Sequence, residues 1–155
     1  MFRIAIEHPD QPEVVRLIAD LDDYQKPLYP PESHHGIDMK ALAQPNVVFA
    51  VARSANDGRA IGCGAVVLES GYGELKRMFV PPAHRGLGIA KAMIAFLEAE
   101  AGKRGCRQMM LETGTLQPEA LGLYERAGYT PRGPFGGYGP DPLSVFMQKP
   151  LTENH

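Results

Sequence analysis

The chain has 155 residues, 44% of them hydrophobic, so it can bury a core without disulfides or metal ions. Its formal net charge is −2 and no Lys/Arg run exceeds two adjacent residues, which argues against a nucleic-acid surface. No apolar run approaches the roughly 18 residues of a membrane span, and the N-terminus lacks the apolar block of a signal peptide. We therefore expect a single cytoplasmic domain over 1–155 that binds neither nucleic acid nor membrane.

Strands and helices alternate along the chain. Val14, Leu17 and Leu21 recur at helical spacing, which predicts a helix with one buried face. The turn sequence Asn56-Asp57-Gly58 joins two apolar runs and predicts a hairpin. In chain order, the expected elements are a strand at 2–7, a helix at 13–24, a short helix at 38–42, strands at 46–53, 59–69 and 74–80, a helix at 86–103, a strand at 107–113, a helix at 118–127, and strands at 129–132 and 143–149.

Strand 74–80, helix 86–103 and strand 107–113 form a βαβ unit, which predicts two parallel strands that are neighbours or nearly so. The two cysteines, Cys63 and Cys106, lie in apolar stretches and are interpreted as reduced packing residues rather than a disulfide.

The segment Arg85-Gly-Leu-Gly-Ile-Ala90 has the features of an anion site. Gly86 and Gly88 lack the Cβ atoms that would keep a ligand away from the backbone. The helix that follows directs unpaired N–H groups and a partial positive charge toward the same point. A phosphate group suits this arrangement.

Two other phosphate-binding motifs compete for this segment. A P-loop needs a Gly-Lys-Ser or Gly-Lys-Thr ending, which is absent. A dinucleotide-binding fingerprint needs a third glycine where Lys91 stands. Such a fingerprint also begins directly after a strand, whereas here residues 81–85 separate the strand from Gly86. Glu112, about 24 residues past Gly88, does stand where that fingerprint has its ribose-binding acid, so the dinucleotide alternative stays open.

Arg85-Gly-Leu-Gly-Ile-Ala90 resembles the (Gln/Arg)-x-x-Gly-x-(Gly/Ala) pyrophosphate loop of the GCN5-related N-acetyltransferases, the GNAT superfamily. Gln117-Pro-Glu-Ala-Leu-Gly-Leu-Tyr-Glu-Arg-Ala-Gly-Tyr129 resembles its second signature, Asn-x-x-Ala-x-x-Leu-Tyr-x-x-x-Gly-Phe, and departs from it at Gln117 and Tyr129. Arg85 and Tyr124 are about 39 residues apart, in the order of the family's motifs. Residues 47–130 carry the resemblance.

The resemblance implies an α/β fold with a mixed, twisted, mostly antiparallel sheet of about seven strands flanked by about four helices. Its central parallel strands would splay apart around acetyl-coenzyme A, the implied cofactor. Pro81 and Pro82 fit such a splay, because each removes an N–H donor where strand pairing would otherwise continue.

The resemblance also assigns the cofactor-binding residues. Backbone groups at the end of strand 74–80 would pair with the amides of the cofactor arm, and the Met78 N–H would meet the thioester oxygen. The loop and the helix start would surround the pyrophosphate. The implied cofactor-binding residues are Met78, Phe79, Val80, Arg85, Gly86, Leu87, Gly88, Ile89, Ala90, Lys91, Gln117, Ala120 and Tyr124.

Two residues carry the expected chemistry. By resemblance, the Tyr124 hydroxyl points at the cofactor sulfur and protonates or hydrogen-bonds the departing thiolate; the alternative is a buried aromatic satisfied by a backbone carbonyl. Glu74, six residues before Val80, stands where some family members have a general base, and period-two alternation places it on one strand face with Lys76, Met78 and Val80. Glu74 as a solvated edge residue paired with Lys76 or Arg77 is the alternative, and Glu112 is the second candidate base.

The acceptor should be selected by the irregular segments 24–36 and 131–144, because loops on a rigid sheet carry specificity. The candidate substrate residues are Tyr29, His34, His35, Glu112, Phe135 and Tyr138, and Tyr24 is a further aromatic candidate. The aromatic residues could instead cap the core. No metal is expected, since the adjacent His34 and His35 point apart on extended backbone.

The sequence thus predicts an acetyl-CoA-dependent N-acetyltransferase that transfers acetyl directly to a primary amine of a small molecule or peptide. Three alternatives remain open: an acyl-CoA-binding sensor or toxin-neutralising partner without turnover, another acyl-CoA donor, and a hydroxyl acceptor. A homodimer is also open.

Overall fold

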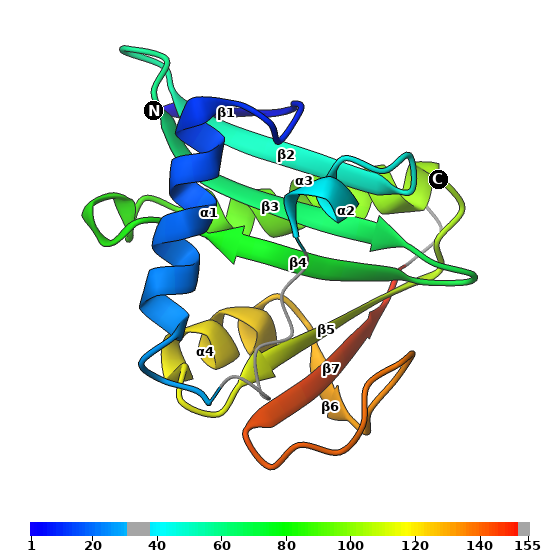
Figure 1. Ribbon diagram of the computed structural model, residues 1–155. Coiled ribbons are helices and arrows are strands. Elements are labelled where there is room, and N and C mark those ends of the chain that lie inside the picture. The colour runs from blue at the N-terminus through cyan, green and yellow to red at the C-terminus, as the bar shows by residue number, and fades with distance from the viewer. Residues whose placement is uncertain (31–37, 152–155) are drawn as a thin grey trace.

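A computed structural model describes residues 1–30 and 38–151 (Figure 1). The described ranges contain one seven-stranded sheet and four α-helices, which confirms the expected fold. In chain order the elements are β1 (Phe2–Ile6), α1 (Pro12–Gln25), α2 (Met39–Leu42), β2 (Val47–Ser54), β3 (Ala60–Leu68), β4 (Gly73–Phe79), the 3-10 turn η2 (Pro82–His84), α3 (Ile89–Lys103), β5 (Gln108–Gly114), α4 (Pro118–Arg126), β6 (Thr130–Arg132) and β7 (Ser144–Pro150).

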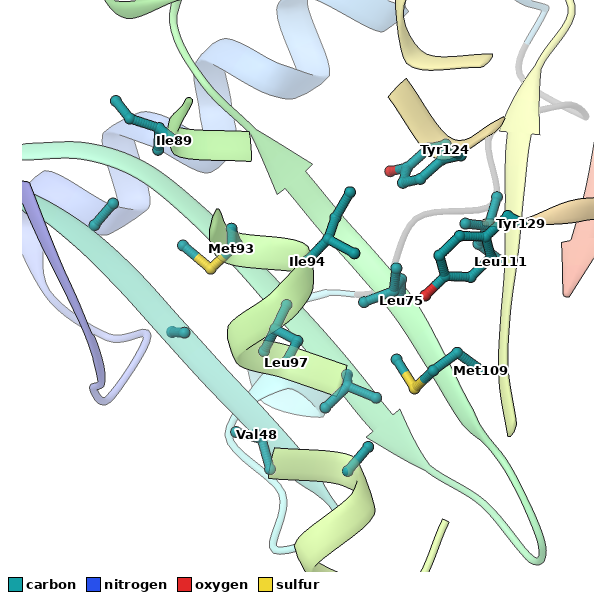
Figure 2. Packing of buried hydrophobic residues seen from close by; sticks show 14 of the residues in the cluster. Val48, Leu75, Ile89, Met93, Ile94, Leu97, Met109, Leu111, Tyr124 and Tyr129 are labelled. Atoms are coloured by element: carbon teal, nitrogen blue, oxygen red, sulfur yellow. The ribbon is translucent and has the colours of Figure 1, made fainter. Parts of the chain in front are cut away.

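The strand order is β1-β2-β3-β4-β5-β7-β6, and every neighbouring pair is antiparallel except β4 and β5. The β4–α3–β5 connection therefore makes the expected parallel pair. α1 and α2 pack on one face of the sheet around Leu17, Leu42 and Phe49. The other face holds α3 and α4 on a core that includes Leu97 and Tyr129 (Figures 1 and 2).

The parallel pair β4 and β5 separates partway along its length. Its register covers only Gly73 with Met109, Glu74 with Met110 and Leu75 with Leu111, although β4 runs on to Phe79 and β5 to Gly114. Figure 1 shows the two strands diverging toward the end where α4 and the last turn of α1 lie. The splay implied by the family resemblance is therefore present, and it leaves backbone groups of β4 facing the gap.

A β-bulge interrupts the alternation of side chains along β4. Lys76 pairs with Ala65 and Phe79 with Cys63, so Arg77 and Met78 together stand opposite a single residue of β3. Arg77 has a φ of 54°, the left-handed region that few residues other than glycine adopt. The extra residue moves everything beyond it to the other face.

The prediction that Glu74 and Lys76 share a face with Met78 and Val80 is consequently wrong. Glu74 and Lys76 pair with Val67 and Ala65, on the face that α1 covers. Met78 and Val80 pack against the core under α3. A period-two pattern cannot reveal an inserted residue, because each half of the strand keeps its own alternation.

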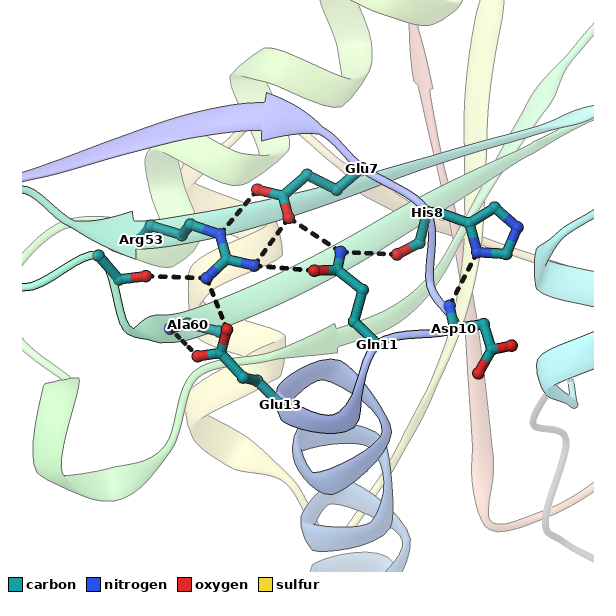
Figure 3. A network of polar contacts seen from close by, with 8 residues as sticks. Glu7, His8, Asp10, Gln11, Glu13, Arg53 and Ala60 are labelled. Carbon is teal, nitrogen blue, oxygen red and sulfur yellow. Dashed lines mark hydrogen bonds and ion pairs between the residues drawn. The ribbon is translucent and has the colours of Figure 1, made fainter.

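A polar cluster fastens the start of α1 to the sheet (Figure 3). The Arg53 guanidinium of β2 donates to Glu7 through Nε at 2.9 Å and Nη2 at 2.8 Å, and to Glu13 of α1 through Nη1 at 2.8 Å. It also donates to the Gly58 carbonyl, at 2.8 Å, and to Gln11 Oε1, at 3.1 Å. Since α1 overlies the splayed strands at its other end, this cluster positions one wall of the site.

No helix in the part of the chain that the structure describes is long and apolar enough to cross a membrane.

Candidate active site

The glycine-rich loop lies in front of the first turn of α3. Gly86 and Gly88 have φ values of 83° and 82°, and a Cβ atom built on either would meet no heavy atom within 4 Å. The sequence predicted that this helix begins at Gly86, but α3 begins at Ile89. The positive φ values of the two glycines explain the difference. Gly88 is the N-cap and has no side chain to satisfy the first N–H groups. The loop is therefore an open cradle that suits an anion such as a pyrophosphate.

The residues of this loop differ in their burial and in what they contact. Ile89 is 2% exposed and packs in the core, so only its backbone can face the cradle. Leu87 and Lys91 are exposed beside the cradle, whereas Ala90 lines a cavity next to it. Arg85 donates through Nε to the Val80 carbonyl, at 3.0 Å, which anchors the loop to the end of β4.

Two adjoining cavities occupy the gap between the splayed strands. The outer cavity opens toward the cradle and is lined by Tyr24, Phe79, Val80, Arg85, Ala90, Glu119 and Leu123. The inner cavity lies deeper between the strands and is lined by Gln25, Tyr29, Leu75, Lys76, Arg77, Glu112, Thr113 and Gly114. Both are lined by Leu21, Met78, Gln117, Ala120 and Tyr124, so these five residues form the junction of the two cavities.

Arg85 borders the mouth of the outer cavity. Its Nη1 lies 3.7 Å from Glu119 Oε2 of α4, and its guanidinium carbon lies 5.6 Å from the centre of the Tyr24 ring. Tyr24, in the last turn of α1, thus lies beside the outer cavity. The Glu119 side chain is 86% exposed, which makes this ion pair weak and easily exchanged for another anion.

Tyr124 stands at the junction with its ring buried and its hydroxyl directed from α4 toward β4 (Figure 2). Its ring packs edge-on against Tyr129, with ring centres 5.9 Å apart. Within residues 1–30 and 38–151, its hydroxyl makes no hydrogen bond. Burial raises the pKa of the phenol, and the charge of Glu112 raises it further. Tyr124 therefore keeps its proton at neutral pH and can donate it.

Glu112 is the carboxylate of the inner cavity. It lies on β5, and its Oε2 accepts a hydrogen bond from the Ser144 hydroxyl of β7 at 2.7 Å. Its negative charge contributes to the raised pKa values of Tyr29, Tyr124 and Tyr138. A carboxylate and a protonated phenol that border one cavity are groups suited to acid–base chemistry.

Glu74, the other candidate base, lies outside both cavities. It is 7% exposed on the face that α1 covers, and it belongs to the lining of neither cavity. Its Oε2 accepts a hydrogen bond from the Tyr138 hydroxyl at 2.5 Å and lies 3.3 Å from Lys76 Nζ. Burial and this bond raise the pKa of Tyr138. The expected pairing of Glu74 with a neighbouring cation is thus present, although the carboxylate is buried rather than solvated.

Tyr29 and Gln117 form the floor of the junction. The Tyr29 hydroxyl donates to Gln117 Oε1 at 3.2 Å and accepts from the Leu116 N–H, also at 3.2 Å. A Cβ on Gly114 would lie 1.6 Å from that hydroxyl, so only glycine fits beneath the phenol. Gln117 thereby holds a fixed position beside both cavities, with its amide nitrogen left to donate.

Two of the other predicted substrate residues, Phe135 and Tyr138, lie outside the lining of both cavities. Phe135 and Tyr138 belong to an aromatic cluster with Tyr72 and Phe146, whose ring centres lie 5.2 to 5.8 Å apart. The sequence left open whether these rings line a substrate pocket or cap the core. Their position fits the capping of the core. His34 and His35 lie outside the described residues.

Sequence reasoning missed several cavity residues. Lys76 and Arg77 were considered only as partners of Glu74, yet both line the inner cavity because the bulge redirects the chain. Leu21 and Gln25 were also missed. Their position at the end of an amphipathic helix, just before the proline-rich segment, was the available signal.

Comparisons with known proteins agree with this geometry. The model of the Acetyltransferase (GNAT) family matches residues 14–129. The IAA acetyltransferase of Azospirillum brasilense is 49% identical over 150 residues, covering 96% of this chain and 97% of that protein. A crystal structure from Klebsiella pneumoniae subsp. pneumoniae MGH 78578, assigned as an acyl-CoA N-acyltransferase, superposes with a TM-score of 0.83 at 41% identity, covering 98% and 99% of the two chains.

A third neighbour shares the fold alone. The PaiA N-acetyltransferase of Thermoplasma acidophilum, crystallised with coenzyme A, has a TM-score of 0.73 at 14% identity, covering 97% of this chain and 99% of that one. The family match, the 49% identical relative and the splayed sheet with its glycine-rich cradle lead to one conclusion: the chain belongs to the GNAT family of acetyltransferases.

Proposed function

We propose that this acetyltransferase transfers an acetyl group from acetyl-CoA directly to a primary amine, with the donor in the outer cavity and the acceptor in the inner cavity. The observation that carries this proposal is the junction, where Tyr124 borders both cavities at once. Two substrates that enter from opposite sides would meet there, so no covalent intermediate on the protein is needed.

The outer cavity and the cradle suit acetyl-CoA. The cradle offers the backbone of Gly86, Gly88 and the first turn of α3 to the pyrophosphate, and Arg85 adds a positive charge. The part of β4 beyond Leu75, unpaired on the β5 side, can hold the amide-bearing arm as a neighbouring strand would, through backbone groups of Met78, Phe79 and Val80. When bound, acetyl-CoA supplies an activated acyl thioester.

Tyr124 acts as the proton donor. As the new bond from nitrogen to carbon forms and the carbon–sulfur bond breaks, negative charge builds on sulfur. Burial and the Glu112 charge keep the Tyr124 phenol protonated, so it can hydrogen-bond that sulfur and then release its proton to it.

Glu112 is the general base that we propose, with Glu74 as the alternative. Glu112 borders the inner cavity, and the hydrogen bond from the Ser144 hydroxyl orients its carboxylate, which can accept a proton from the acceptor ammonium. Glu74 lines neither cavity and contacts Lys76, which lines the inner one. The ammonium loses two protons in all: Glu112 takes the first, and the second, released from nitrogen once the new bond has formed, replaces the proton that Tyr124 gives to sulfur.

A screen of amine acceptors tests the proposal. Amino acids, polyamines, aminoglycosides and peptide N-termini are incubated with acetyl-CoA, and released thiol and acetylated product are both measured. IAA belongs in the same screen because the A. brasilense relative is called an IAA acetyltransferase. Product formation with at least one amine is expected. Transfer only to hydroxyl or carboxyl acceptors, or no acetylated product at all, contradicts the proposal.

A further inference from the structure

Among the described residues, two cations and one carboxylate border the inner cavity. Lys76 and Arg77 of β4 line it from one side, and Glu112 of β5 lines it from the other. The Lys76 and Arg77 side chains are only 16% and 10% exposed, so little water screens their charges.

Each of these two cations has an acidic partner outside the lining of the cavity. Arg77 is ion-paired through Nη1 with Asp22 of α1, and Lys76 Nζ lies 3.3 Å from Glu74. Neither Asp22 nor Glu74 lines either cavity. These two ion pairs fix the positions of the Lys76 and Arg77 side chains, which border the cavity.

The charge of the described lining therefore favours one class of acceptor. A polycationic amine would bring extra positive charge beside Lys76 and Arg77, which like-charge repulsion disfavours. A molecule with one amine and one carboxylate meets a charge of opposite sign at each end. A guanidinium is also a group that binds carboxylates well.

We infer that the acceptor is an amino-acid-type zwitterion, whose carboxylate lies against Lys76 and Arg77 while its amine faces Glu112 and the junction. This inference rests on the proposed function and names the substrate class of the same site. The carboxylate is not acetylated; it fixes the orientation that brings the amine to Tyr124.

Matched acceptor series test this inference. Each series keeps one skeleton and changes one group: phenylalanine, its amide and phenethylamine form one series, and methionine, its amide and 3-(methylthio)propylamine form another. We expect kcat/KM for the preferred amino acid to exceed that of its amide and its decarboxylated amine by at least tenfold. Equal or better use of the amide or amine in the skeleton with the highest turnover overturns the inference but leaves the proposed function intact.

Variants of Arg77 and Lys76 test where the carboxylate of the acceptor binds. Arg77→Gln and Lys76→Met should each reduce the preference for acid over amide, chiefly through KM for the amino acid. Asp22→Asn is the matched control, because it removes the charge of one acidic partner of Arg77 and keeps the guanidinium; it should keep the preference. A preference unchanged in both cation variants, or lost equally in Asp22→Asn, contradicts the assignment.

Circular dichroism and coenzyme A binding show whether each variant is folded. If no amine of either series or of the acceptor screen is acetylated while coenzyme A binds, the proposed function itself fails and this inference fails with it.

Discussion

Glu112 and Tyr124 face the same cavity from different elements, β5 and α4, and the charge of the carboxylate contributes to the raised pKa of the phenol. This relationship separates two proton tasks. The carboxylate is suited to accept a proton from the acceptor, and the phenol, held in its protonated form, is suited to donate one.

Replacing Tyr124 by Phe removes one oxygen and keeps the ring. We expect kcat to fall about tenfold or more, equivalent to roughly 1.4 kcal/mol, with little change in KM for acetyl-CoA. The matched control is Tyr129→Phe, which removes the hydrogen bond to Glu98 at 2.8 Å and should lower the melting temperature while keeping kcat. Full kcat in Tyr124→Phe would make its hydroxyl structural.

The two candidate bases give different pH profiles when mutated. Glu112→Gln should lower kcat by about 10²–10⁴-fold at neutral pH and recover part of that loss as rising pH deprotonates the amine unaided. Glu74→Gln should instead lower stability, because it disturbs the buried contacts to Tyr138 and Lys76. Rates measured from pH 6 to 10 decide the assignment; a profile recovered at high pH only in Glu74→Gln would return the role to Glu74.

Coenzyme A should stabilise the fold through the cradle. At a concentration about 100 times its dissociation constant, linkage contributes about 2.7 kcal/mol, which moves a melting curve by several degrees. Gly88→Asp puts a side chain and a negative charge into the cradle and should abolish this shift. Gly71→Asp is the control, since Gly71 also has a positive φ and open space but lies in the β3–β4 turn. A shift with NAD instead would support a dinucleotide site.

Arg53 should make the stability dependent on pH. Hydrogen bonds from its guanidinium are the largest cause of the lowered pKa values of Glu7 and Glu13. A lowered folded-state pKa contributes stability above the unfolded pKa, near 4.3, and loses it as pH falls through the folded value. Arg53→Met should therefore cost about 2 kcal/mol at pH 7 and progressively less below pH 4.

Urea denaturation at pH 7 and at pH 3.5 measures this difference in the cost of Arg53→Met. Glu13 is half-exposed and should contribute less than Glu7. Arg59→Met, at an exposed position, serves as control and should change stability by less than about 0.5 kcal/mol. A cost of Arg53→Met that is the same at pH 7 and pH 3.5 would contradict the ionic account.

Local signals in the sequence predicted most of the helices and strands, and the family resemblance supplied the splayed, mixed sheet. Hydrophobic periodicity placed α1, the alternation of elements predicted the parallel pair, and the two glycines predicted the cradle. The start of α3 was placed three residues early, because the helix-like composition from Gly86 onward gives no sign that both glycines adopt positive φ.

The site was harder to predict than the fold. The bulge at Arg77 depends on how β4 pairs with β3, which is a contact between distant parts of the chain. Without the bulge, Glu74 looks like a neighbour of Met78, and Lys76 and Arg77 look like surface charges. The position of Glu112 beside Tyr124 likewise depends on the splay of two strands, which composition does not encode.

Direct transfer at the junction is tested by initial rates measured over a grid of acetyl-CoA and acceptor concentrations, with the best amine from the screen. If both substrates must occupy the adjoining cavities together, double-reciprocal plots give lines that intersect. Parallel lines, together with an acetylated form of the protein detected by mass spectrometry when the acceptor is left out, would contradict this account.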